Sequence, residues 1–406
     1  MPRTMPCILL LITLVTTVGA APVPTIANDA TPQGGIDQLI LEPVWRLGGE
    51  DDEDSFFGVI DDVALDDTGN ILLADIQLMQ VHVVSPDGEL VGELGRQGEG
   101  PGEVTRLGAI LPLPGDRVGM VQLMPGRVVM VDSGGMPAGD IIPRWEEAGG
   151  RLMLASLKRA GDGLVAAGRR MVRREETFNL DLWIAPLAMD GSLGEPLYHI
   201  ERALDSRSMV RRELDGEWAG QGRWTATSDG NVILAPERNE YRLEVYGESG
   251  LERIFTREFE SRQRTTAEKE AVESRMSQFR GRGRNRASVE VEVAETVADI
   301  GSLTPMPGSE VWIKTSRSGQ DQPTGTMLTY DVFDSEGNFT RQIAVQCEGN
   351  LKHDALFPLA DGWFIMVKGH ADAMAAMRGT ENNDQDDDID DAAPLEIIGL
   401  RAVNES

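Results

Sequence analysis

The stretch DDVALDDTGNILLADIQLMQVHVVSPDGELVGELG, residues 61–95, decides the fold. It holds four short apolar runs, separated by turns at residues 68–70 and 86–88 and by a connection between them. Tight hairpins place Gly, Asn, Asp or Pro-Gly between two strands, because their turns require positive φ angles. The stretch therefore predicts strand, turn, strand, connection, strand, turn, strand, which is one four-stranded antiparallel sheet.

The same pattern recurs along the chain. Turns that open a unit contain Gly69, Gly115, Gly163, Gly230, Gly308 and Gly362, spaced 46, 48, 67, 78 and 54 residues apart. Second turns follow at 86–88, 189–191, 248–250 and 335–338, with a looser loop at 134–139. Four strands in a period of roughly 40–50 residues are typical of propeller blades. The two wide spacings predict insertions.

The last unit offers only three strands, at 351–359, 363–368 and 395–403. A fourth is available at residues 43–48, which resemble the outer strand at 90–95, and closing a ring in this way hides sheet edges. We therefore expect an all-β fold, a six-bladed β-propeller of four-stranded antiparallel blades, with an N-terminal strand that closes the last blade. The expected domain spans 42–406, after an N-terminal linker at 21–41.

One helical insertion is expected between blades 4 and 5, within residues 263–290. Thr265 and Glu268 have the spacing of a capping box before the helix formers of Thr265–Arg280. A second irregular segment, at 370–393, is expected to be an acidic loop.

Residues 74–88 resemble the NHL repeat, with Leu78 and Gln80 in place of its typical Asn and Arg. The loop GRQGEGPGEV at 95–104 is similar to the loop that follows this repeat in bacterial six-bladed, TolB-like propellers. That family includes protein-binding scaffolds, lactonases and a peptide-amidating lyase. The resemblance implies the fold but selects no function.

The N-terminus has the layout of a signal peptide over residues 1–20. Arg3 precedes an apolar run at 7–18, which is followed by Gly19 and Ala20. We expect an exported protein, periplasmic or extracellular, with no membrane span. Its mature chain would keep Cys347 alone, so no intramolecular disulfide could form.

The charge balance is strongly acidic, with 67 acidic and 38 basic residues and a net charge of −29. Nucleic-acid contacts need clustered Lys and Arg, so we expect no nucleic-acid partner. The acidic runs at 51–54 and 381–391 are interpreted as solvated loops, with weak Ca²⁺ binding as the alternative. The arginines of 280–286 either neutralise these loops or dock a partner. The partner, protein or small molecule, is unspecified, and a monomer is expected.

Candidate site residues come from loops expected to share one face of the ring, called here the loop face. It collects the connections between successive blades and the loops between the two middle strands of each blade. The candidates are Gln77, Arg96, Glu99, Arg238, Asn239, His353 and Asp354.

No cofactor is assigned. The sequence lacks a Gly-x-Ser-x-Gly turn, and its four His residues form no close ligand pair. His353-Asp354 is the one pair expected near the axis. The predicted function is a binding or interaction module that acts through the loop face. The alternative is a metal-dependent lyase or lactonase.

Overall fold

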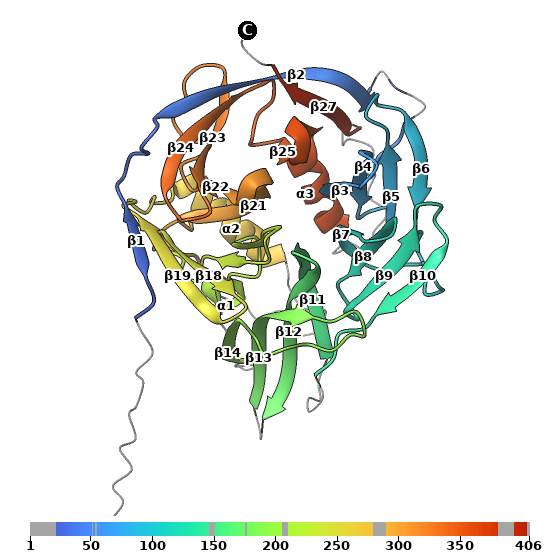
Figure 1. The fold of residues 1–406 in the computed structure, drawn as a ribbon, viewed down its shortest axis with the longest axis horizontal. Helices are drawn as coiled ribbons and strands as arrows, with labels where there is room; N and C mark the ends of the chain where they lie inside the picture. The colour runs from blue at the N-terminus through green and yellow to red at the C-terminus, as the bar shows by residue number, and fades with distance from the viewer. Residues whose placement is uncertain are drawn as a thin grey trace, which may run out of the picture.

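The computed structural model describes residues 22–50, 52, 55–145, 151–174, 177–204, 210–278, 290–380 and 394–403. Its sheets are antiparallel for the most part and are arranged in a ring, as in a propeller (Figure 1). The segment interpreted as a signal peptide, the arginine run at 280–286 and the acidic run at 381–391 lie outside the described residues.

Three sheets each contain four antiparallel strands in chain order. The first has β3 (Ile60–Leu65), β4 (Ile71–Asp75), β5 (Gln80–Val84) and β6 (Leu90–Leu94). The second has β7 (Leu107–Leu113), β8 (Arg117–Gln122), β9 (Arg127–Asp132) and β10 (Pro137–Ile141). The third has β11 (Arg151–Ala160), β12 (Gly163–Arg174), β13 (Thr177–Leu187) and β14 (Tyr198–Leu204).

A fourth sheet carries an extra strand at its outer edge. It contains β16 (Trp224–Ala226), β17 (Val232–Leu234), β18 (Arg242–Gly247) and β19 (Gly250–Arg257), with β1 (Thr25–Asn28) parallel to β19. The Asn28 side chain fixes β1 there, because its amide donates to the carbonyls of Thr256 and Gly337 at 3.0 Å each. Residues 21–41 are thus not simply a linker, since β1 lies within them.

The last sheet has eight strands and joins β2, the second strand of the described chain, to β27, the last one. Its order is β21 (Ile300–Met306), β22 (Glu310–Thr315), β23 (Thr326–Phe333), β24 (Phe339–Gln346), β2 (Ile36–Gly48), β27 (Glu396–Ala402), β26 (Trp363–Lys368) and β25 (Ala355–Pro358). Strand β2 runs parallel to β24 and then antiparallel to β27, where Leu47 pairs with Ile397. The predicted pairing of the N-terminal strand with the last one is therefore confirmed.

The turn chemistry explains the hairpins. Each predicted turn that opens a unit joins two strands paired antiparallel, with 3-10 turns at Pro307–Ser309 and Ala360–Gly362 in the last two units. In the first turn, Gly69 has φ of 87° and the Asp66 carboxylate accepts the backbone N–H groups of Thr68 and Asn70, each at 2.8 Å. These local contacts are encoded in adjacent residues, which is why the turns can be found in the sequence.

The core lies between neighbouring sheets. Ile71 of β4 and Ile365 of β26 are fully buried in one apolar cluster, while Phe255 of β19 and Phe333 of β23 pack in another with ring centroids 5.0 Å apart. Strands β4, β8 and β26 are buried on both faces, which is why their sequences are nearly continuous apolar runs. Burial thus stabilises the ring, and Cys347 is a free thiol.

Helix α2 (Thr266–Gln278) occupies the widest spacing, and its predicted capping box is confirmed. The Thr265 N–H donates to Glu268 Oε2 at 2.8 Å, and the Glu268 N–H donates to Thr265 Oγ1 at 3.2 Å. The two insertions also contact each other. Strand β15 (Val210–Arg212), beside the short helix α1 (Glu213–Gly216), pairs in parallel with β20 (Glu290–Glu292).

The expected acidic loop at 370–393 begins as a helix instead. Helix α3 (His370–Thr380) lies inside the ring near its centre (Figure 1). Its Met374 and Met377 pack against the apolar cluster between β5 and β8, so one side of the helix is buried. The sequence interpretation missed this helix because a strongly acidic run follows it. Among the described residues, no helix is long and apolar enough to cross a membrane.

Candidate functional site

The connection between β4 and β5 carries Gln77 over a buried carboxylate. Gln77 is exposed, and its backbone N–H donates to Asp75 Oδ1 at 3.0 Å. Asp75 is fully buried and also accepts the N–H groups of Gly58 at 2.7 Å and Val59 at 3.1 Å. Burial works against its ionisation, but these bonds and His82 hold the pKa of Asp75 below its ordinary value. Asp75 therefore holds the loop before β3 in place through hydrogen bonds, while the Gln77 side chain stays exposed.

Arg96, a candidate site residue, pairs with Glu103 of the same loop. Arg96 Nε donates to Glu103 Oε1 at 2.7 Å, and Glu103 Oε2 accepts the Gly100 N–H at 2.8 Å. The bond from Gly100, followed by that from Arg96, lowers the pKa of Glu103. The loop thus folds around Glu103, with Arg96 and Glu99 exposed on its surface.

Arg238 and Asn239 follow β17 and are held by the second insertion. Arg238 donates to the Thr296 carbonyl at 2.6 Å, and the Thr296 hydroxyl donates to Asn239 Oδ1 at 2.9 Å. Arg238 also forms an ion pair with Glu217, on the segment that precedes β16. Burial lowers the pKa of Arg238, whose side chain is 13% exposed. The structure therefore brings these two candidates together, but engages them internally.

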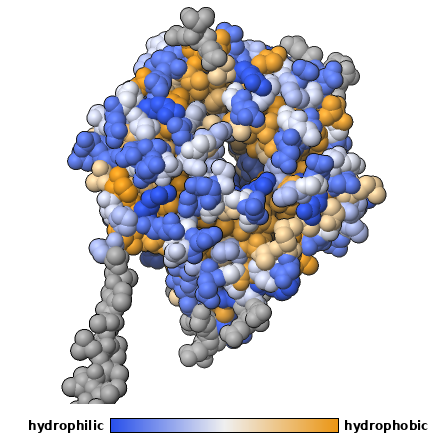
Figure 2. Space-filling model, in the orientation of Figure 1, coloured by the Kyte–Doolittle hydropathy of each residue, from blue (hydrophilic) through white to orange (hydrophobic). Residues whose placement is uncertain are grey.

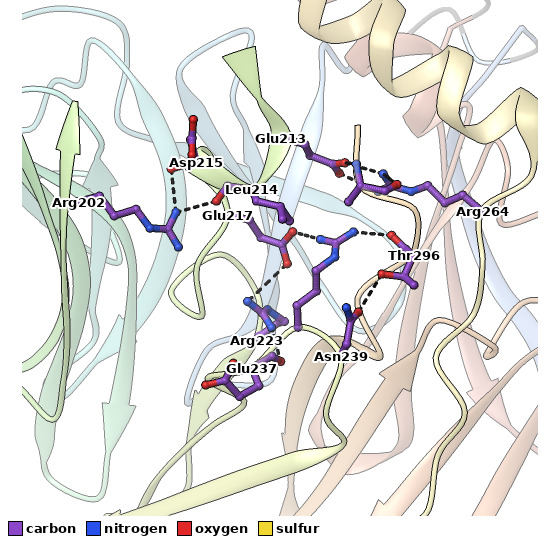
Figure 3. A network of polar contacts seen from close by, with 12 residues as sticks. Arg202, Glu213, Leu214, Asp215, Glu217, Arg223, Glu237, Asn239, Arg264 and Thr296 are labelled. Atoms are coloured by element: carbon purple, nitrogen blue, oxygen red, sulfur yellow. Dashed lines mark hydrogen bonds and ion pairs between the residues drawn. The ribbon is translucent and has the colours of Figure 1, made fainter. Parts of the chain in front are cut away.

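This polar network continues through both insertions (Figure 3). Glu217 lies 3.5 Å from Arg223, which donates to the Glu237 carbonyl at 2.6 Å. Glu213 of α1 takes two hydrogen bonds from Arg264, at 2.5 and 2.7 Å, and one from the Ala294 N–H at 3.0 Å. Burial opposes the ionisation of Glu213, yet Arg264 and Ala294 keep its pKa below the ordinary value. The network joins three loops into one rigid surface.

Sequence reasoning found two members of this network, Arg238 and Asn239, and missed its other charged residues. Glu213, Glu217 and Arg264 come from segments 51 residues or less apart in sequence, but nothing local marks them as partners. The one available signal was the pair of wide turn spacings, which placed both insertions on the same side of the ring.

His353 and Asp354 are joined to α3. His353 Nδ1 lies 3.0 Å from Asp372 Oδ2, and the His353 carbonyl accepts the Ala371 N–H at 2.8 Å. Asp354 accepts the N–H groups of Asn350 at 2.7 Å and Gly369 at 3.0 Å. The pair predicted at the strand entrance thus anchors the start of α3, with the His353 side chain 55% exposed.

A second His–Asp contact ties α3 to the inner strand β3. His370 Nε2 lies 3.4 Å from Asp61 Oδ1. The next residue, Asp62, accepts the Ile110 N–H of β7 at 2.9 Å, and burial raises its pKa, although Lys158 of β11 opposes this rise. Charged groups therefore line the inside of the ring, and the face drawn in Figure 2 is hollowed at its centre.

The chemistry available at these positions is polar contact. Among the described residues, no three His, Cys, Asp or Glu side chains are grouped as a metal site requires. Cys347 lies at the end of β24, where burial raises the pKa of its thiol to about 12 and keeps it protonated. The remaining His residues have structural surroundings: His82 is buried beside Asp75, and His199 is in the outer strand β14.

Comparison with known proteins gives structural likenesses only. No family model matches the chain, and no curated protein matches its sequence. A protein from Bacteroides fragilis that is named as exported has 10% identity and a TM-score of 0.49, over 94% of this chain and 100% of that one. Virginiamycin B lyase from Staphylococcus aureus has 8% identity and a TM-score of 0.42, over 89% and 100%.

A gluconolactonase from Xanthomonas campestris has 9% identity and a TM-score of 0.41, over 85% of this chain and 87% of that one. The similar structures thus include both enzymes and an exported protein whose name states no activity. Likenesses at this level do not choose between a binding module and an enzyme.

Proposed function

We propose that this protein is an exported, six-bladed β-propeller of the NHL or TolB-like type that binds a partner through its loop face without catalysis. The strand order supports six units, because the eight-stranded sheet can be divided within β2. One part is β21 to β24, with the first half of β2 added at its edge, and the other is the second half of β2 with β27, β26 and β25. Export rests on the signal-peptide layout of residues 1–20.

The observation that carries the proposal is the network of Figure 3. Buried Arg–Glu pairs fix the segment before β16, the loop after β17 and the α2 insertion against one another. A surface held in one conformation loses little entropy when a partner docks, so its contacts translate into affinity. The same pairs engage Glu213 and Glu217, so within this network neither carboxylate is free to act as a catalytic acid or base.

Site-specific photo-crosslinking in the cell envelope of the producing organism tests this proposal. A benzophenone amino acid would replace Gln77, Arg96 or Asn239 on the loop face, and Asp87, Asp116 or Glu336 at the opposite strand ends as matched controls. All six are exposed. We expect one discrete crosslinked species from the loop face and none from the controls.

Crosslinks from the control positions alone would contradict the proposal. So would a rise in melting temperature with millimolar Zn²⁺ or Ca²⁺ together with metal-dependent lactone hydrolysis, the behaviour expected of the alternative enzyme. Partner identity plays no part in either outcome.

A further inference from the structure

Strands β12 and β13 form a hairpin that reaches beyond the rest of the ring (Figure 1). Near the ring, Val165 and Ala167 are buried against Trp218 and Trp224. Because successive side chains alternate between the two faces of a strand, Arg169, Met171 and Arg173 continue the face of Val165. The outer half of this face therefore extends past the cluster that covers its inner half.

Cross-strand pairing defines a patch on this outer half. Arg173 lies opposite Phe178, Met171 opposite Leu180, and Leu180 opposite Arg202 of β14. We call Arg169, Met171, Arg173, Phe178, Leu180 and Arg202 the hairpin patch. Its centre is apolar and its two sides are basic.

The apolar centre is open to solvent. Met171 is 42% exposed and Phe178 is 41% exposed, with the Arg173 guanidinium 5.8 Å from the Phe178 ring. Arg202 donates to the backbone carbonyls of Leu214 and Asp215, at 2.8 Å each, so this side of the patch borders the backbone of α1 (Figure 3). Scattered exposed apolar residues are ordinary, but neighbouring ones such as Met171 and Phe178, flanked by arginine, are typical of an interaction surface.

The charge of this region is opposite to that of the molecule. Residues 151–174 contain seven Arg or Lys and one Asp, so their net charge is +6 in a chain of −29. Glu175 and Glu176 follow and leave 151–176 at +4. On the face that carries the patch, no position of β12, β13 or β14 is acidic, because Asp181 and Glu201 lie on the other face, with Asp181 paired to Arg170.

Building on the proposed function, we propose that the hairpin patch binds an extended acidic segment of a partner protein. The partner's carboxylates pair with Arg169 and Arg173, and an apolar side chain between them packs on Met171 and Phe178. A nucleic acid would need more basic contacts than the patch offers. An anionic bilayer would meet the acidic surface of the ring around it, whereas a peptide reaches the patch alone.

Fluorescence anisotropy with a defined probe tests this inference on the mature chain. The probe is the fluorescein-labelled peptide Glu-Asp-Phe-Glu-Glu-Leu-Asp, and its control has Gln or Asn at every acidic position. We expect Arg169→Glu with Arg173→Glu to weaken binding about tenfold or more, close to 1.4 kcal/mol, and to reduce its dependence on salt between about 50 and about 150 mM. Phe178→Ala should weaken binding several-fold and leave the salt dependence unchanged.

Arg117→Glu is the matched charge reversal, in the β7–β8 turn at the opposite strand ends, and should bind as the unmodified protein does. If the double variant Arg169→Glu/Arg173→Glu binds the probe as tightly as the unmodified protein does, the inference is overturned. Equal affinity for the acidic probe and its uncharged control also overturns it. So does binding to phosphatidylglycerol vesicles without binding to the peptide. In that case, crosslinks from Gln77 or Asn239 that persist in the double variant would show that the proposed function still stands.

Discussion

Trp45 provides a sharp test of how β2 closes the ring. Its indole is 8% exposed, and its ring centroid lies 6.3 Å from that of Trp363. On the partner strand β27, Gly399 lies directly opposite Trp45, and a Cβ added at Gly399 would overlap the indole. The strand pair therefore fits because one residue is large and the other has no side chain.

Replacing Trp45 by alanine removes a buried aromatic ring, which costs about 3–5 kcal/mol of the free energy of unfolding. Gly399→Ala alone overpacks the same place and costs about 1–3 kcal/mol. In a Trp45→Ala background, however, the methyl group at 399 enters vacated space, so the second change should cost less than about 0.5 kcal/mol. The two effects are predicted to be non-additive by about 1–3 kcal/mol.

Urea titrations followed by far-UV circular dichroism measure this cycle, because the helix and strand signal does not depend on the lost tryptophan. Val44→Ala is the control on the same strand, since Val44 is 54% exposed and should change stability by less than about 0.5 kcal/mol. Additive losses, or a loss below about 1 kcal/mol for Trp45→Ala, would refute the argument that this contact closes the ring.

Three further predictions follow from the loops and the N-terminus. Asp75→Asn should lower the free energy of unfolding at pH 7 by about 1–3 kcal/mol. Because the pKa of Asp75 is lowered in the folded protein, the carboxylate stabilises the fold above the ordinary carboxyl pKa, and this stabilisation is lost as the pH falls below that value. The urea midpoint of the variant should therefore change less between neutral and acid pH than that of the unmodified protein. Glu213→Gln leaves Arg264 without its ion pair, and limited proteolysis should cut the α2 insertion faster than in a Glu273→Gln control, whose side chain is exposed; equal cleavage rates would contradict the role of the pair. Intact-mass analysis of the exported protein should place its first residue near Ala21, and a retained Met1 would exclude signal cleavage.

The parts of the fold that were predictable are those encoded in neighbouring residues. The turn around Gly69 and the capping box of Thr265 and Glu268 each depend on contacts within a few residues, and both are present. The N-terminal strand was also found, because the segment around Trp45 repeats the pattern of an outer strand that already had a place in the unit.

Elements that depend on contacts between distant residues, or on the path of a loop, could not be predicted in this way. Strand β1 pairs in parallel at an outer edge, so it needs no hairpin turn, and its four residues are too few to establish a strand pattern in the sequence. The contact between Arg96 and Glu103 was not predicted, because it depends on how the loop turns back on itself at its glycines. Helix α3 escaped because its apolar side, with Met374 and Met377, is short and precedes a strongly acidic run.

The contacts seen in the structure favour residues at the edge of the loop face, rather than in its middle, as the ones that bind a ligand. Arg238 and Arg264 are charged residues of the kind expected to meet a ligand, but they already pair with Glu217 and Glu213 in a largely buried network. A ligand that engaged either arginine would have to break a buried pair, which is costly. On the described positions of β12, β13 and β14, no acidic residue shares the face of Arg169 and Arg173, and the Arg173 guanidinium lies 5.8 Å from the exposed Phe178 ring. The proposed function therefore assigns the positioning of this face to the network and the contact with a partner to the hairpin patch.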